Sequence, residues 1–415
     1  MKKRRVVITG MGTINPLGNT VEEYWNNLLA GASGVGPITR FDTSAYRTNI
    51  AAEVKNFDPT TFFDRKMAQR MDPFTHYAVA SAVQAVASAG LDTGGVDKDR
   101  AGVVVGSGIG GMWTNFQQQK LFHESGPRQI SPFFVPMLIT DIAAGYISIM
   151  FGYKGPNYGT VSACATASHA IGDAYMLIER DMADVMVTGG AEAAITPMGL
   201  GGFGAMRALS TRNDDPATAS RPFDKDRDGF VMGEGSGIVI LEELEHALAR
   251  GANIICELCG IGFTGDAYHI TEPAPGGEGA VRSMKLAIKD AGMQPEEIDL
   301  VNAHGTSTPY NDRNETAAIK SVFGSHASKL KVNSTKSMIG HLLGAAGGVE
   351  VIATALMVQQ NKVHATLNQI TPDPDCDLDY VPGAAIDHVV NAAVTNTFGF
   401  GGHNTSIVLK KYNGA

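Results

Sequence analysis

The chain has 415 residues, of which 44% are hydrophobic and 18% charged, and its net charge is -9. This length exceeds the size at which one core keeps growing, and the composition excludes a disordered or fibrous chain. The negative charge argues against nucleic-acid binding, and no apolar run approaches the roughly 18 residues of a membrane span. We therefore expect a soluble, cytoplasmic α/β protein.

Short β-branched runs bounded by glycine alternate with amphipathic segments along the chain. This alternation predicts a layered α/β fold whose strands form sheets of mixed direction. The predicted strands span residues 6–9, 101–106, 185–189, 237–241, 300–303, 331–334, 393–397 and 406–409. The predicted helices span residues 20–30, 73–89, 164–181, 279–291, 314–323 and 344–359, where apolar residues recur at three-to-four spacing.

A boundary between two structural halves is predicted near residues 251–255. A charged helix ends there at Arg250 and Gly251, and a new apolar run begins. We expect an N-terminal half of residues 1–253 and a C-terminal half of residues 254–415. The two halves show no internal repeat by residue identity.

A glycine-rich segment at residues 106–111 follows one of the predicted strands. Its sequence, Gly-Ser-Gly-Ile-Gly-Gly, matches the Gly-x-Gly-x-x-Gly pattern of dinucleotide-binding loops. The residues after it do not obviously open a packed helix, and no second strand with an acidic end follows at the expected distance. We therefore interpret the segment as a flexible loop.

Cys164 lies where a strand-like apolar run meets a helix of small residues, in the sequence Val161-Ser162-Ala163-Cys164-Ala165-Thr166. In the first turn of a helix, the positive end of the helix dipole favours the thiolate. A cysteine alone is more often a small core residue. The small neighbours, which let a substrate approach closely, favour a nucleophile.

The other cysteines, Cys256, Cys259 and Cys376, carry no such signal. Four cysteines in so long a chain are too few for a disulfide scaffold. The Cys-x-x-Cys pair formed by Cys256 and Cys259 has no second pair nearby, which disfavours a structural zinc site. We expect Cys256 and Cys259 to be a pair of core residues, and we expect no bound metal.

Two histidines stand at the edges of glycine-bounded motifs. His304 closes an apolar run and is followed by Gly305-Thr306-Ser307-Thr308-Pro309, whereas His341 follows Gly340 and precedes a Gly/Ala-rich helix. Neutral imidazoles in such places can donate hydrogen bonds to a developing oxyanion or move a proton. One cysteine with two such histidines predicts acyl chemistry on a thioester.

A second glycine-rich segment, Phe398-Gly399-Phe400-Gly401-Gly402, lies near the C-terminus. Glycines leave backbone N–H groups accessible, which suits an oxyanion hole, and a tight turn before the last strand is equally compatible.

Together these motifs resemble the β-ketoacyl-[acyl-carrier-protein] synthases, condensing enzymes of the thiolase superfamily. The resemblance runs from Val6 to Asn404 and includes Ser210-Thr211-Arg212-Asn213 and Gly233-Glu234-Gly235. It implies a thiolase-like fold of two similar halves in α-β-α-β-α layers, a homodimer, and acyl carrier protein as partner. Residues 202–209 and 372–379 look most like type II, the elongating class. Type I is a close alternative, and polyketide ketosynthases use the same residues.

The resemblance also implies catalytic roles. Cys164 would hold the acyl group as a thioester, with the backbone N–H groups of Cys164 and Phe400 stabilising the oxyanion. His304 and His341 would bind the malonyl thioester oxygen, and Lys336 would support them.

Further residues match positions that support the site or bind substrate. Glu350 would pair with Lys336, Thr306 and Thr308 would bind the phosphopantetheine arm, and Phe400 would gate the acyl pocket. Candidate docking residues for the acidic carrier protein are Lys66, Arg70 and Arg207. No metal or redox cofactor is implied, because phosphopantetheine is carried by the carrier protein.

Departures from the family pattern are few. His403 stands where the family often has threonine, and Tyr310-Asn311-Asp312 varies a loop. Both put substrate preference in doubt more than activity. A non-condensing, chain-binding partner subunit is the alternative of a different class. It would be expected to lack the nucleophile, and Cys164 is present.

Overall fold

The computed structural model describes residues 3–91 and 96–414. Ten strands form one mixed sheet in the order β10-β9-β13-β14-β8-β1-β7-β6-β4-β5. They are β1 Val6–Ile14, β4 Ala101–Gly106, β5 Asn157–Tyr158, β6 Val185–Glu192, β7 Gly235–Glu243, β8 Cys256–Gly265, β9 Leu300–Asn302, β10 Lys331–Asn333, β13 Ala392–Gly399 and β14 His403–Lys410. Two small ribbons pair β2 Gly36–Pro37 with β3 Ile50–Ala51, and β11 Lys362–Val363 with β12 Ile386–Asp387.

The helices are α1 Val21–Leu29, α2 Arg65–Ala68, α3 Pro73–Ser88, α4 Met112–Ser125, α5 Phe134–Leu138, α6 Ile142–Phe151, α7 Thr166–Glu179, α8 Pro197–Ala205, α9 Leu244–Ala249, α10 Glu278–Asp290, α11 Pro309–Phe323, α12 Lys336–Ile339 and α13 Ala346–Gln360. In the described part of the chain, no helix is both long and apolar enough to cross a membrane.

The two halves of the sheet repeat one topology. From the centre outwards, one half runs β1-β7-β6-β4-β5 and the other runs β8-β14-β13-β9-β10. In both, the first three strands pair antiparallel and the last three pair parallel. The halves meet where β1 pairs antiparallel with β8. The sequence showed no repeat because topology, and not residue identity, is duplicated.

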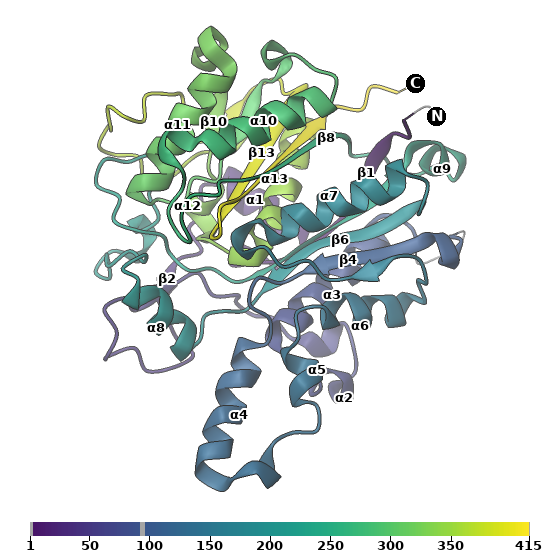
Figure 1. Cartoon of the computed structure of the whole chain (residues 1–415), viewed down its shortest axis with the longest axis vertical. Coiled ribbons are helices and arrows are strands. Elements are labelled where there is room, and N and C mark those ends of the chain that lie inside the picture. The colour runs from purple at the N-terminus through teal and green to yellow at the C-terminus, as the bar shows by residue number, and fades with distance from the viewer. Residues whose placement is uncertain (1–2, 92–95, 415) are drawn as a thin grey trace.

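Helices cover and separate the two halves in layers (Figure 1). α7 and α13 lie between the half-sheets, α3 and α6 cover one outer face, and α10 and α11 cover the other. From top to bottom the view passes through α10, the strands β8 and β13, α7, the strands β6 and β4, and α3. The thiolase-like α-β-α-β-α fold predicted from the sequence is confirmed, while a division at residue 253 stays a prediction.

In each half, a glycine lets the first strand pack closely against its outer helix. A methyl group on Gly12 of β1 would lie 2.0 Å from the Ser81 oxygen of α3, and one on Gly262 of β8 would lie 2.0 Å from the Ser283 oxygen of α10. Only glycine permits so close an approach of strand and helix. This proximity fixes the depth at which each half-sheet sits and thus where its loops meet.

The structure corrects two interpretations of local structure. α4 begins directly after the glycine-rich segment, at Met112, and projects from the body together with α5 (Figure 1). Sequence periodicity missed it because its apolar residues do not gather on one face, and Thr114 alone is buried. The strand-like run before Cys164 is irregular, and Cys164 lies in a short 3-10 turn, Ala163–Ala165, ahead of α7.

Candidate active site

A cavity of about 390 Å³ brings together side chains from four distant segments. Cys164 comes from the turn before α7, His304 from the loop after β9, His341 from the segment after α12, and Phe400 from the hairpin between β13 and β14. The convergence of the four motifs therefore comes from the layered fold, which places these loops at one edge.

The turn that presents Cys164 has an unusual backbone. Ala163 has a φ of 50°, in the left-handed region that a residue with a Cβ rarely adopts. Thr166 stabilises the turn, because its hydroxyl donates to the Ala163 oxygen at 2.7 Å and accepts from the Ser162 N–H at 2.8 Å. Leu343, with a φ of 48°, takes the same place before α13 in the other half. Strained backbone of this kind persists only where the surroundings hold it.

The protonation of Cys164 differs from the sequence prediction. Burial raises the pKa of the thiol to about 12, although the nearby Lys336 charge and the Phe400 N–H oppose the shift. The predicted preference for thiolate was wrong because the helix start is visible in sequence, whereas the enclosure of the thiol is not. At neutral pH the resting side chain is a thiol.

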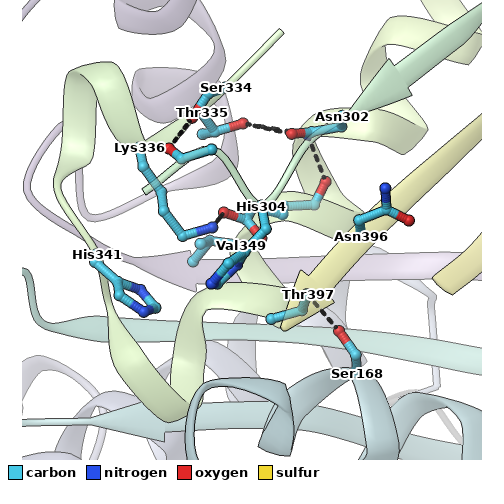
Figure 2. A network of polar contacts seen from close by, with 12 residues as sticks. Ser168, Asn302, His304, Ser334, Thr335, Lys336, His341, Val349, Asn396 and Thr397 are labelled. Carbon is cyan, nitrogen blue, oxygen red and sulfur yellow. Dashed lines mark hydrogen bonds and ion pairs between the residues drawn. The ribbon is translucent and has the colours of Figure 1, made fainter. Parts of the chain in front are cut away.

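The two histidines of the cavity are neutral and adjacent. Their ring centres lie 5.2 Å apart and the rings are nearly perpendicular, at 84°. Burial first, and the Lys336 charge second, hold the pKa of both imidazoles well below the usual value. In Figure 2 both rings and the Lys336 side chain lie close to one another. Two neutral imidazoles at one point suit hydrogen-bond donation to a developing negative charge.

The tautomer of His341 is set by its neighbour. The Leu343 N–H donates to His341 Nδ1 at 3.3 Å, so the ring proton sits on Nε2. His304 Nδ1 is buried and has no hydrogen-bond partner within the described residues. His304 Nδ1 thus has no competing protein partner among these residues, and His341 carries its proton on Nε2.

Buried charges lie behind the two rings. Lys336 forms a buried ion pair with Glu350, and neither side chain lines the cavity. Glu315 of α11 accepts from the backbone N–H groups of His304 and Gly305, both at 2.8 Å. Burial raises the pKa of Glu315 and of Glu350 to about 7.

Sequence reasoning missed two buried carboxylates, Glu315 and Glu192. Glu192 accepts four hydrogen bonds, from Ser107, Gly108, Ile109 and Gly344. The available signal was a single acidic residue inside the small apolar run Ala191-Glu192-Ala193-Ala194. A buried carboxylate without a cation must find other donors.

The hairpin that carries Phe400 packs directly on the nucleophile turn. A methyl group on Gly399 would lie 2.9 Å from the Ser162 oxygen and 3.1 Å from the Cys164 nitrogen. Gly401 and Gly402 have φ values of 85° and 74°, which a turn of this shape requires of glycine. The Phe400 N–H consequently reaches the Cys164 thiol.

Gly399→Ala is expected to lower turnover about tenfold or more while leaving the protein folded. The added methyl group must push the hairpin from the Cys164 turn, and a displacement of reacting groups by about 1 Å can cost a hundredfold in rate. Gly36→Ala is the matched control, because a methyl group there meets nothing within 4 Å. Turnover and melting temperature should be measured for both; equal turnover would contradict the close packing.

Of the remaining residues predicted for the site, some line the cavity and others do not. Thr306 and Thr308 line the cavity with their hydroxyl groups 2.9 Å apart, and the exposed Arg207 lies at its edge. Lys66 of α2 and Arg70, which lies just beyond α2, do not line the cavity, and the Arg70 guanidinium lies 4.6 Å from the centre of the Phe133 ring. The structure therefore brings one of the three proposed docking residues to the cavity.

The variable positions lie beside the site. His403 is exposed at the start of β14, where its ring packs near Gly401, and Tyr310 and Asn311 line the cavity. Cys256 and Cys259 are buried on β8. Across residues 3–91 and 96–414, no three His, Cys, Asp or Glu side chains are grouped so as to hold a metal ion.

Comparison with known proteins agrees with this geometry. Residues 3–247 match the model of the beta-ketoacyl synthase N-terminal domain, and residues 255–369 match that of the C-terminal domain. The chain is 54% identical to 3-oxoacyl-[acyl-carrier-protein] synthase 2 of Synechocystis over 99% of both chains. It is also 54% identical to the protein of that name from Staphylococcus aureus, again over 99% of both chains.

Solved structures show the same fold. The ishigamide ketosynthase/chain length factor superposes with a TM-score of 0.93 at 36% identity, over 99% of this chain and 100% of that one. A beta-ketoacyl synthase from Burkholderia phymatum gives a TM-score of 0.91 at 35% identity, with the same coverage. A third match is a chain from a structure described as a type II polyketide synthase acyl carrier protein in complex with its ketosynthase. It superposes with a TM-score of 0.92 at 33% identity, over 99% of this chain and 100% of that one. The chain belongs to the beta-ketoacyl synthase family.

Proposed function

We propose that this protein condenses malonyl-[acyl carrier protein] with an acyl chain held as a thioester on Cys164, with loss of carbon dioxide, in fatty acid elongation. The product is 3-oxoacyl-[acyl carrier protein]. The observation that carries the proposal is one cavity in which a thiol faces a backbone N–H donor and two neutral imidazoles. The relatives of 54% identity carry the name of this activity.

The first stage transfers the acyl group. The Cys164 sulfur attacks the acyl thioester carbon, a new C–S bond forms, and the bond to the carrier thiol breaks. The carrier thiol leaves with the proton that Cys164 gives up. The N–H groups of Cys164 and Phe400 donate to the oxyanion of the tetrahedral intermediate. A donor prearranged for that charge stabilises the transition state more than it stabilises the bound substrate.

The second stage forms the carbon–carbon bond. The malonyl carboxylate leaves as carbon dioxide, and its electron pair moves into an enolate of the thioester. His304 and His341 donate hydrogen bonds to the enolate oxygen. The α-carbon attacks the acyl thioester on Cys164, the C–S bond breaks, and the Cys164 thiolate takes one proton from solvent. Burial, reinforced by the charge of Lys336 in its pair with Glu350, keeps both imidazoles neutral, so that they act as donors without carrying charge.

The cavity edge and the surface supply the remaining parts of the proposal. Thr306 and Thr308 bind the phosphopantetheine arm, and Phe400 moves to admit the acyl chain. Arg207, with Lys66 and Arg70, meets the acidic carrier protein. The enzyme works in the cytoplasm as a homodimer and needs no metal or redox cofactor.

The function is tested by mass spectrometry of carrier protein after the enzyme is supplied with acyl and malonyl carrier protein. The expected product is 3-oxoacyl carrier protein lengthened by one two-carbon unit, with one carbon dioxide released per product. Repeated extension without reduction would instead favour a polyketide-type ketosynthase, the class named for one of the solved relatives. Carbon dioxide release without any condensed product would contradict condensation.

A further inference from the structure

The glycine-rich segment that resembles a dinucleotide loop cradles an anion of the protein itself. Glu192, at the end of β6, is fully buried, and its Oε1 accepts from the Ser107 hydroxyl at 2.9 Å and the Ile109 N–H at 3.2 Å. Its Oε2 accepts from the Gly108 N–H at 2.9 Å. Successive backbone N–H groups of this kind form a nest for an anion.

The same carboxylate reaches across to the other half of the molecule. Oε2 also accepts from the Gly344 N–H at 3.0 Å. A methyl group on Gly344 would lie 2.3 Å from the Gly108 nitrogen and 2.6 Å from Glu192 Oε2, so the two glycine turns close tightly over the carboxylate. Glu192 thus joins a loop after β4 to the turn before α13.

That second turn sets the tautomer of His341. Leu343, directly before Gly344, has the left-handed φ of 48° and donates its N–H to His341 Nδ1. A strained turn keeps its shape only if its surroundings hold it. The Glu192 bond to the Gly344 N–H is one such restraint on the turn.

We propose, on the basis of the condensing function above, that Glu192 is a positioning residue: it holds the Leu343–Gly344 turn so that His341 keeps its proton on Nε2. It does not line the cavity, and it acts through His341 and not on substrate. The glycine-rich segment is accordingly a clamp for Glu192 and not a nucleotide site.

The carboxylate is suited to this position because it accepts only. Each of its oxygens receives two donors, so the NH₂ group of an amide faces either the Gly108 and Gly344 N–H groups or the Ile109 N–H and the Ser107 hydroxyl, of which only the hydroxyl can turn to accept. Glu192→Gln therefore keeps the volume and burial of the side chain but sets its NH₂ group against at least one backbone N–H in either orientation. A role in packing alone would survive this change.

The test separates the two stages in Glu192→Gln. Acylation of the protein is followed by mass spectrometry, condensation by product formation, and the His341 tautomer by imidazole ¹⁵N NMR. We expect condensation to fall about tenfold to a hundredfold, because a hydrogen-bond donor is misplaced, and acylation to change less than about threefold. The His341 ring should change from the Nε2-protonated form to a mixture.

Glu242→Gln is the matched control. Glu242 is equally buried and bonds to Thr9, His246 and Arg250, but it pairs with Val185 at the opposite end of β6. It should lower the melting temperature without altering the ratio of condensation to acylation. If Glu192→Gln lost both stages in equal proportion, or left His341 unchanged, the positioning role would be refuted.

Two further measurements keep the proposal decisive. Glu192→Asp retains an acceptor-only group, so it should condense faster than Glu192→Gln. It also takes the place of Glu192→Gln in the test if Glu192→Gln does not fold. Complete loss of condensation in Glu192→Asp would count against the proposal only if the His341 tautomer were unchanged. Wild-type condensation in the same assay tests the proposed function separately. If the wild type does not condense, that function fails, while the NMR result still decides whether Glu192 sets the tautomer.

Discussion

Replacing Cys164 with alanine is expected to abolish the acyl adduct on the protein and to lower condensation by at least about a thousandfold. Loss of a catalytic nucleophile has effects of this size, because no covalent intermediate can form. Cys164 is the cysteine that lines the cavity, and the hairpin N–H of Phe400 reaches its sulfur. Intact-protein mass spectrometry after incubation with acyl carrier protein measures the adduct directly.

Cys259→Ala is the matched control for this substitution. Cys259 is buried on β8, where its thiol donates to the Val408 oxygen, and it does not line the cavity. The control should still form one acyl adduct per chain. An adduct on Cys164→Ala, or its loss in Cys259→Ala, would place the acyl group on another residue and refute the assignment.

The fold was largely predictable because most elements show a clear period. Length separated the two kinds of element: residues 101–106 form a short apolar run typical of a buried strand, whereas the apolar segment at residues 73–89 is too long for one. The sequence did not predict α6 or α8. In α6 the apolar residues are so numerous, and in α8 the glycines are so frequent, that no apolar face stands out. The duplicated topology could not be predicted, because the two halves show no repeat by residue identity.

The site was predictable as motifs but not as a network. Cys164, His304, His341 and Phe400 stand beside glycines and strand ends, which mark them in the sequence, and they share one cavity. Glu192 and the backbone that it holds at Gly344 lie 152 positions apart, so only the fold brings them together. The pKa of Cys164 depends in the same way on enclosure by distant segments, which explains why helix position alone predicted the wrong direction.

His304→Ala and His341→Ala are each expected to retain acylation of Cys164 and to lose condensation by about a hundredfold or more. Removing one prearranged donor from a developing oxyanion typically has this effect. Both rings lie in the cavity and are held neutral, so each loss removes a hydrogen bond that is made in the second stage. Adduct mass and product formation, measured on the same sample, separate the two stages.

The two substitutions should differ in stability, which distinguishes them from each other. At position 304, Glu315 bonds the backbone N–H, so His304→Ala leaves the local turn satisfied. His341→Ala instead leaves the buried Leu343 N–H without its acceptor, at a cost of about 1–3 kcal/mol.

His326→Ala, which removes a half-buried ring bonded to the Ile298 oxygen, controls for the loss of an imidazole elsewhere and should condense normally. Normal condensation in either cavity variant would refute the donor role. Equal melting temperatures for His304→Ala and His341→Ala would show instead that Leu343 does not depend on His341, and with it the link from Glu192 to the imidazole would lose its last step.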